Sequence, residues 1–424
     1  MTTANDTDRE TVAERCERLV QEHFKQHPFE KPHELETFVP AEDGVLLLKD
    51  NVIIPKNTFK TSIDAPSLLL HNLANLDAST VKEKAVYKFI DTTRNMCSGL
   101  YGTSGAGKTR SAYEYLSLNF GLYFVANTTN DPGSQDLSKL IARCKCRCKP
   151  NAQDLDSQAE APASTSNGNY VLVLGYVNIM ILVRNAVFAA LNEQLKSKSM
   201  PELTPYQWLL IQLFPNEAAK EDIFASVQCQ CFEHHNTLAQ AGVDDTSVMA
   251  ALDSPPKWWT TMVVDEAQLL LNQLDEGYFL SRCGTKKRSL FSAVLKAMSM
   301  QLDEKHNDVT GYPLACGTGM SIDELQDQSE SIFVKNPLAN FEDAVFKEFP
   351  VLTESDVRNY ILSFLSISTD TNYPECIQSD CVIEHTSQWL RGRPRTVATF
   401  LEVYLTRKKY KSNQDNSQVE ESFP

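Results

Sequence analysis

The feature that most restricts the fold of this chain is an eight-residue segment, Gly102-Thr103-Ser104-Gly105-Ala106-Gly107-Lys108-Thr109. Its spacing fits G-x-x-x-x-G-K-[ST], the pattern of the phosphate-binding P-loop. Glycines let the backbone curl so that successive N–H groups face phosphate oxygens, and the N-terminus of a following helix adds partial positive charge. We therefore expect residues 102–110, with Arg110 included, to bind a nucleotide. Lys108 is expected at the β- and γ-phosphates and the Thr109 hydroxyl at Mg²⁺.

The flanks of this segment have the structure that a P-loop requires. Residues 96–101 read as a strand, 110–119 as a helix, and 121–127 as a second strand bounded by turn residues. A strand, a loop, a helix and a strand in this order are the opening of a parallel α/β sheet. The predicted fold is a P-loop NTPase with a parallel five-stranded sheet flanked by helices, a helical insertion and a C-terminal helical lid.

A second motif follows an apolar run, Trp258-Trp259-Thr260-Thr261-Met262-Val263-Val264, which ends in Asp265-Glu266-Ala267-Gln268. An apolar run is typical of a buried parallel strand, and ligands bind at the carboxyl ends of such strands. We expect Asp265 to hold the Mg²⁺ shell as a Walker-B aspartate and Glu266 to activate water as the general base. The alternative is that both acids simply lie at the exposed end of a strand.

Two further strands are predicted after this motif, at residues 312–316 and 331–335. The first is followed by Gly317-Thr318-Gly319, and Thr318 is our candidate for a side chain that contacts the γ-phosphate. The alternative reading is a plain turn from strand to loop. Residues 81–340 are therefore assigned to the NTPase core.

Helical patterns interrupt this core between about residues 137 and 250, at 170–196, 205–214 and 222–241. The polar segment 150–169 is predicted to be disordered. A zinc site is a further hypothesis, since Cys144, Cys146 and Cys148 precede Cys229, Cys231, His234 and His235. Alternating C-x-C-x-C is not the usual C-x₂-C zinc clip. The alternative is a basic surface helix with incidental thiols and a second helix whose histidines face solvent.

The remaining regions flank the core. Residues 1–80 are an accessory region, with an amphipathic helix over 8–26 and short strand candidates at 45–48 and 52–54. A helix over 82–94 precedes the first strand. Residues 341–410 form the lid, with a helix over 352–365 capped by Thr353. Residues 411–424 are a disordered tail.

Three arginines, Arg391, Arg393 and Arg395, surround the start of the last lid helix, which we place at Pro394 because proline suits the first helical turn. Arginine binds phosphate oxygens through a planar fork that stays charged. We expect Arg393 to reach the ATP phosphates from the lid. The alternative is a solvated basic turn.

The order of these motifs resembles that of P-loop ATPases with an additional catalytic glutamate, the class that holds AAA+ and STAND ATPases. The segments 100–110, 263–268, 316–321 and 391–395 are similar to the NTPase module of Crinkler and retrotransposon-hot-spot proteins. The resemblance covers roughly residues 80–410. It implies an ATPase module, but the trafficking motif and the effector domain that often accompany that module are not recognisable here.

Composition limits the partners that the chain can have. A net charge of −15 does not indicate a nucleic-acid surface, although a local basic groove stays open. Eleven scattered cysteines and a polar N-terminus indicate reduced thiols and no classical signal peptide, hence a cytoplasmic or nuclear protein. The family resemblance leaves delivery into a host cell open. The apolar run 170–183 is too short for a membrane span and suits a buried helix.

The predicted function is Mg²⁺-dependent binding and hydrolysis of ATP, which drives a conformational or assembly switch. A homo-oligomer or a protein partner is compatible with this function. A non-hydrolysing nucleotide-binding scaffold and a nucleic-acid-stimulated ATPase are the alternatives. A helicase needs a second lobe, for which roughly 90 residues after the fifth strand are too few. A small-molecule kinase would not need Glu266 after Asp265.

Overall fold

The computed structural model describes residues 10–32, 34–39, 52–56, 65–93, 96–126, 131–149, 164–240, 261–274, 278–280, 287–300, 313–318, 344–365 and 380–406. The chain divides into two compact units. The first comprises Met1–His33, Leu76–Ser104 and Ser111–Phe349, and the second comprises Glu34–Asn75, Gly105–Arg110 and Pro350–Pro424. Each unit has an apolar core of its own. The predicted accessory region 1–80 is therefore shared between two cores.

The first unit is built on a five-stranded sheet in the order β2-β3-β6-β1-β7, in which every neighbouring pair is parallel. The strands are β1 Ser98–Tyr101, β2 Leu122–Val125, β3 Met262–Asp265, β6 Pro313–Gly317 and β7 Val345–Phe346. The side chains of β2 and β3 are buried throughout, as expected for strands covered on both faces. The α/β class and the five-stranded parallel sheet flanked by helices are thus confirmed.

The fifth strand differs from the prediction. β7 lies within the range assigned to the lid, and it pairs with β1 through Gly99 and Val345. The predicted strand at 331–335 and the candidate at 45–48 lie outside the described residues, as do Trp258 to Thr260. Two residues are too few to show a strand periodicity, which explains why the sequence did not indicate β7.

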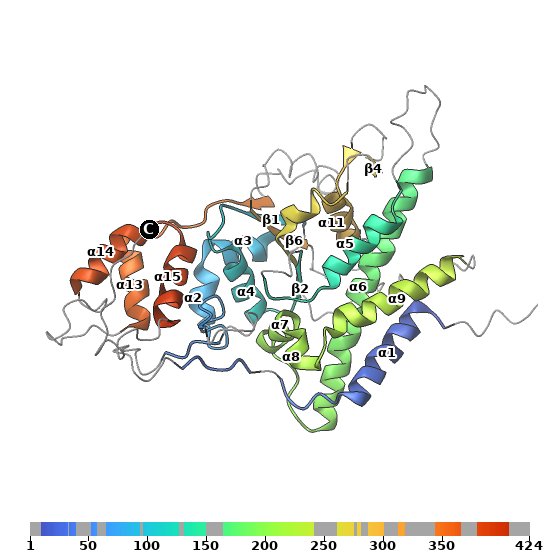
Figure 1. Ribbon diagram of the computed structural model, residues 1–424, viewed down its shortest axis with the longest axis horizontal. Coiled ribbons are helices and arrows are strands. Elements are labelled where there is room, and N and C mark those ends of the chain that lie inside the picture. Colours follow the sequence, from blue (N-terminus) through green and yellow to red (C-terminus); the bar gives the residue numbers. More distant parts are fainter. Residues whose placement is uncertain are drawn as a thin grey trace, which may run out of the picture. The chain divides into compact units, whose positions relative to one another are not determined.

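Helices surround the sheet of the first unit (Figure 1). Their bounds are α1 Val12–Gln26, α2 Ala78–Glu83, α3 Ala85–Thr93, α4 Lys108–Leu118, α5 Asp136–Arg147, α6 Ser164–Ser197, α7 Pro205–Leu213, α8 Pro215–Ala219, α9 Ile223–Gln240, the 3₁₀ turn η2 Ala267–Leu270 and α11 Leu290–Met300. A small antiparallel pair, β4 Phe279–Leu280 and β5 Lys287–Arg288, accompanies them. The helix predicted over 82–94 is instead two helices that meet at Lys84.

The helical insertion is organised around α6, which contacts α1, α5, α9 and α11. Its first residues correct the sequence analysis, because α6 begins at Ser164, inside the segment predicted to be disordered. Asn169 is buried there, and its amide nitrogen donates to the carbonyls of Lys149 (2.8 Å) and Tyr278 (2.7 Å). These hydrogen bonds satisfy the buried amide of Asn169 and stabilise the start of α6.

Among the described helices, α6 is long and apolar enough to cross a membrane by length and composition alone. Most of its apolar window is buried inside the protein, as in the core helix of a globular domain. The predicted apolar run was therefore part of a longer helix, and its burial agrees with the expected core position.

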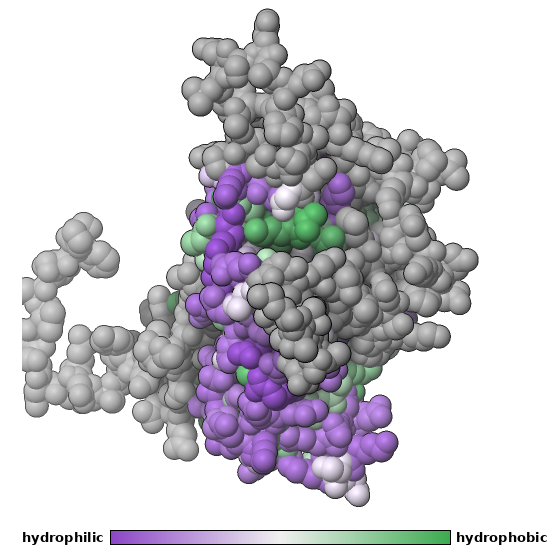
Figure 2. Space-filling view, turned by 90° about the vertical axis from the view of Figure 1, so that its right-hand side faces the viewer, coloured by the Kyte–Doolittle hydropathy of each residue, from purple (hydrophilic) through white to green (hydrophobic). Residues whose placement is uncertain are grey.

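The N-terminal helix α1 packs on α6 and α9 with Val12, Cys16, Val20 and Phe24 buried, which confirms the predicted amphipathic helix. A capping box between Thr11 and Glu14 fixes where it begins. From the side on which α1 and α9 lie, the described surface is mainly hydrophilic (Figure 2).

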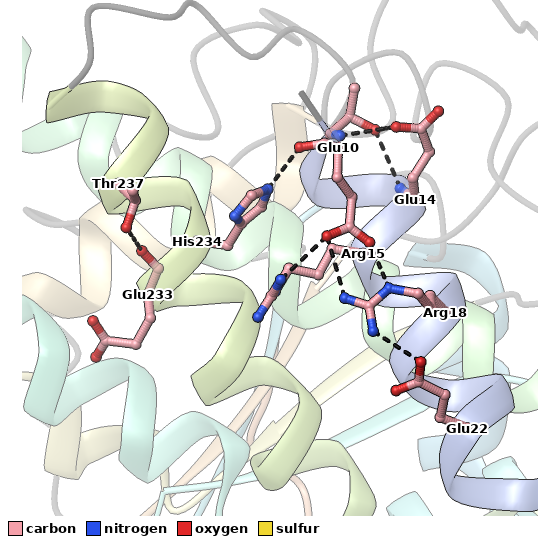
Figure 3. Close-up of polar contacts among 9 residues, drawn as sticks. Glu10, Glu14, Arg15, Arg18, Glu22, Glu233, His234 and Thr237 are labelled. Atoms are coloured by element: carbon pink, nitrogen blue, oxygen red, sulfur yellow. Dashed lines mark hydrogen bonds and ion pairs between the residues drawn. The ribbon is translucent and has the colours of Figure 1, made fainter. Parts of the chain in front are cut away.

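Polar contacts also join α1 to α9 (Figure 3). The Glu10 carboxylate accepts from Arg15 (3.1 Å) and Arg18 (2.7 Å), and His234 Nε2 donates to the Glu10 carbonyl at 2.7 Å. Hydrogen bonding to Arg18 lowers the pKa of Glu10. His234 and His235 are half-buried, so the alternative to a zinc site, in which both histidines face solvent, was wrong.

The second unit contains α13 Glu354–Phe364, α14 Asp380–Leu390 and α15 Pro394–Thr406. Its core joins residues of these helices to Phe38, Ile54 and Leu68 from the N-terminal third of the chain. Thr353 caps α13 and α15 begins at Pro394, both as predicted, and Asp356 completes a capping box with Thr353. Residues 352 and 392 form an antiparallel bridge, with Gly392 at a φ of 120°.

Candidate functional site

The glycine-rich segment follows β1 directly and ends where α4 begins at Lys108. Gly105 and Gly107 have φ values of 79° and 104°, in the left-handed region that favours glycine. A Cβ atom on Gly107 would meet no atom within 4 Å in the described part of the chain. The segment therefore turns through its glycines and presents bare backbone at Gly107, as its sequence predicts.

Contacts inside the second unit hold the C-terminal part of the glycine-rich segment. The Arg395 backbone N–H donates to the Gly105 carbonyl at 3.2 Å, and a Cβ on Gly105 would lie 2.8 Å from Arg395 Cβ. Arg110 Nη1 donates to the carbonyls of Leu69 and His71, both at 2.8 Å. Arg110 thus has a structural role that the sequence analysis missed. Burial, followed by the charge of Arg110, lowers the pKa of His71 to about 4.

One of the three predicted lid arginines, Arg395, contacts the glycine-rich segment through its backbone N–H. Arg393 directly precedes α15, and the side chains of Arg391, Arg393 and Arg395 are exposed. The contact with Gly105 comes from Arg395. A role for Arg393 at a phosphate stays a prediction.

Asp265 ends β3 with its carboxylate buried and bonded at both oxygens. Tyr123 Oη donates to Oδ2 at 2.9 Å, and the Glu266 N–H donates to Oδ1 at 2.9 Å. The Tyr113 hydroxyl on α4 donates to that of Tyr123 at 3.3 Å. The predicted magnesium residue is therefore fixed by side chains that the sequence analysis did not single out.

Glu266 follows with a φ of 53° and a ψ of 36°, a left-handed conformation that is uncommon for residues other than glycine. Gln268 orients the Glu266 carboxylate, because the Gln268 side-chain nitrogen donates to Glu266 Oε2. The side-chain Oε1 of Gln268 accepts the Thr318 backbone N–H at 3.0 Å. Gln268 thereby joins Glu266, after β3, to Thr318, after β6. Strained residues held by their surroundings cluster at functional sites.

A buried polar cluster supports β2 from the helical insertion. Arg184 on α6 is fully buried and bonds Asp136 Oδ2 through Nε at 2.8 Å, and Nη1 bonds Gln212 Oε1 at 2.8 Å. The Gln212 oxygen also accepts the Tyr123 N–H at 2.9 Å. The guanidinium lies 4.6 Å from the centroid of the Phe124 ring and 4.4 Å from that of Phe224. The strand that carries Tyr123 is thus anchored in the insertion.

The cysteine and histidine motifs have not assembled a metal site within the described residues, where no group of three or more such side chains could hold an ion. Cys144 is buried in the core of the first unit and Cys148 is nearly so. The thiols therefore pack against apolar side chains, and the alternative reading of a surface helix with incidental thiols was wrong for these two.

Three comparisons with known proteins were made. No family model, no curated protein and no solved structure matches the chain.

Proposed function

We propose that the chain binds ATP with Mg²⁺ and hydrolyses it to drive a conformational or assembly switch. The observation that carries the proposal is the strand order. Asp265 ends β3 and Glu266 follows it, Thr318 follows β6, and the glycine-rich segment follows β1. These three strands are neighbours in one parallel sheet. Their carboxyl ends share an edge, which is where such sheets bind ligands.

The residues at this edge of the sheet fit ATP with Mg²⁺. The left-handed glycines with open space at Gly107 suit backbone N–H groups that approach phosphates, and Lys108 adds a charge at the start of α4. Thr109 and Asp265 supply the hydroxyl and carboxylate oxygens that Mg²⁺ prefers. When bound, Mg²⁺ would neutralise charge on the phosphate oxygens.

The other residues have separate roles in the proposal. Glu266 accepts the proton of the attacking water, and Gln268 orients its carboxylate. Thr318 contacts the γ-phosphate, and the guanidinium of Arg393 binds phosphate oxygens. With these roles, we propose a P-loop ATPase with an additional catalytic glutamate. The likeness to Crinkler-type NTPase modules is part of the same proposal.

A scaffold that binds the nucleotide without turnover is the second candidate. The favoured role is hydrolysis, because Glu266 has a left-handed backbone conformation and its carboxylate is oriented by Gln268. Gln268 also bonds Thr318, which follows the neighbouring strand. A scaffold has no need of an oriented base beside the buried aspartate.

Replacement of Glu266 by glutamine separates the two functions. Glu266→Gln keeps the shape of the side chain and removes the base, so turnover should fall about 10²–10⁴-fold while ATP binding persists. The matched control is Glu17→Gln, at an exposed position of α1, which should hydrolyse ATP at the wild-type rate. If the wild-type protein binds ATP and its turnover equals that of Glu266→Gln, the scaffold function is correct.

A further inference from the structure

Two buried tyrosine hydroxyls form a chain that ends on Asp265. Tyr123 on β2 donates to Asp265 Oδ2 at 2.9 Å, and Tyr113 on α4 donates to Tyr123 at 3.3 Å. The two rings meet edge to face, with centroids 5.2 Å apart. Both side chains are completely buried in the first unit.

The register of the sheet explains why Tyr123 reaches Asp265. Tyr123 pairs with Val263 across the parallel strands β2 and β3. Alternate residues of a strand share a face, so the side chain of Asp265, two residues after Val263, lies on the face of Tyr123. The long phenol spans the remaining distance along the strand.

The burial of these two hydroxyls indicates that hydrogen bonding is part of the role of Tyr113 and Tyr123. A hydroxyl in an apolar core costs free energy unless it is hydrogen-bonded, and phenylalanine would fill the same space without that cost. A tyrosine phenol has an ordinary pKa of about 10, so each hydroxyl keeps its proton at physiological pH and can donate it.

We propose that Tyr123, supported by Tyr113, is a positioning residue that orients the Asp265 carboxylate for magnesium. The inference rests on the proposed function, which places Mg²⁺ beside Asp265. One carboxylate oxygen is held by Tyr123 and the other by the Glu266 N–H, so the plane of the carboxylate is fixed at both ends. Side chains that orient metal-binding carboxylates tune affinity for the metal.

The test compares ATP binding by calorimetry with Mg²⁺ and with EDTA. Tyr123→Phe should bind ATP as the wild type does in EDTA, while its half-saturating Mg²⁺ concentration at fixed ATP rises roughly 10–100-fold. Tyr113→Phe leaves the bond from Tyr123 to Asp265 in place, so it should raise the half-saturating Mg²⁺ concentration less than Tyr123→Phe does. Tyr113→Phe also keeps the inference testable if Tyr123→Phe does not fold.

The matched control is Tyr176→Phe. Its hydroxyl donates to Asn236 Oδ1 at 3.0 Å between α6 and α9, so it loses a hydrogen bond of the same kind without touching Asp265. A double variant, Tyr123→Phe with Asp265→Asn, should need no more Mg²⁺ than Asp265→Asn alone, because Tyr123 acts through Asp265.

The outcomes separate this inference from the proposed function. If wild type shows Mg²⁺-dependent ATP binding and Tyr123→Phe has the Mg²⁺ dependence of Tyr176→Phe, the positioning role is overturned and the ATP site stands. If wild-type protein binds no ATP with Mg²⁺, both are overturned.

Discussion

Arg184 gives the sharpest stability prediction, because its charge is fully buried beside an equally buried Asp136. Arg184→Met keeps most of the volume and removes the charge. It leaves the Asp136 carboxylate in the core without its partner and takes a cation from between two aromatic rings. Breaking a buried pair in this way costs about 3–5 kcal/mol. That is a large share of the roughly 5–15 kcal/mol that stabilises a typical protein.

The pH dependence of this loss has a definite sign. Burial raises the pKa of Asp136 above its ordinary value, and the charge of Arg184 opposes that rise. A carboxyl group whose pKa is higher in the folded protein than in the unfolded chain stabilises the fold while it is protonated, below its ordinary pKa. This stabilisation is lost as the pH rises through the pKa of the folded protein. Without Arg184 the pKa of Asp136 rises further. The deficit of Arg184→Met should therefore be smaller near pH 5 than near pH 8.

Urea unfolding followed by tryptophan fluorescence measures both effects. One of the four tryptophans is the buried Trp208, whose Nε1 donates to the Gly121 carbonyl at 2.9 Å. The matched control is Arg143→Met, since Arg143 pairs with the exposed Glu233 and should lose no more than about 1 kcal/mol. An Arg184→Met protein as stable as Arg143→Met, or one with the same deficit at both pH values, would refute the reasoning.

Two further predictions concern the edge of the sheet. Gly107→Ala should lower stability by about 1–3 kcal/mol through its left-handed φ and should weaken ATP binding, whereas Gly105→Ala should destabilise more because its Cβ would also clash with Arg395. Urea unfolding and calorimetry measure both, and wild-type ATP affinity in Gly107→Ala would contradict the proposed phosphate site. Gln268→Ala should lower kcat roughly 10–100-fold with little change in ATP affinity, because Glu266 loses its orientation. An unchanged kcat would show that the bridge to Thr318 has no part in turnover.

Local sequence patterns were enough to predict much of the fold. The helix α1, the start of α15 at Pro394 and the strands β1, β2, β3 and β6 follow from apolar spacing, capping residues and turn residues close to them in the sequence. The glycine conformations at the candidate site follow from the motif itself. These features depend on interactions over a few residues, which a single sequence exposes.

The features that the sequence did not reveal depend on distant contacts. Tyr123 and Asp265 are 142 residues apart, and their hydrogen bond requires the register of β2 on β3. The burial of Cys144 depends on how α5 packs in the core, and β7 is too short to show a period. The composition of residues 1–80 does not indicate that they divide between two cores.

Stabilisation by Mg·ATP tests the central claim most directly. A ligand present at 100 times its Kd adds about 2.7 kcal/mol to the free energy of unfolding. We expect this gain for the wild-type chain in urea unfolding, and no gain for Lys108→Ala, which lacks the charge at the start of α4. A wild-type protein that Mg·ATP does not stabilise, or a Lys108→Ala protein that it stabilises equally, would contradict the proposed nucleotide site.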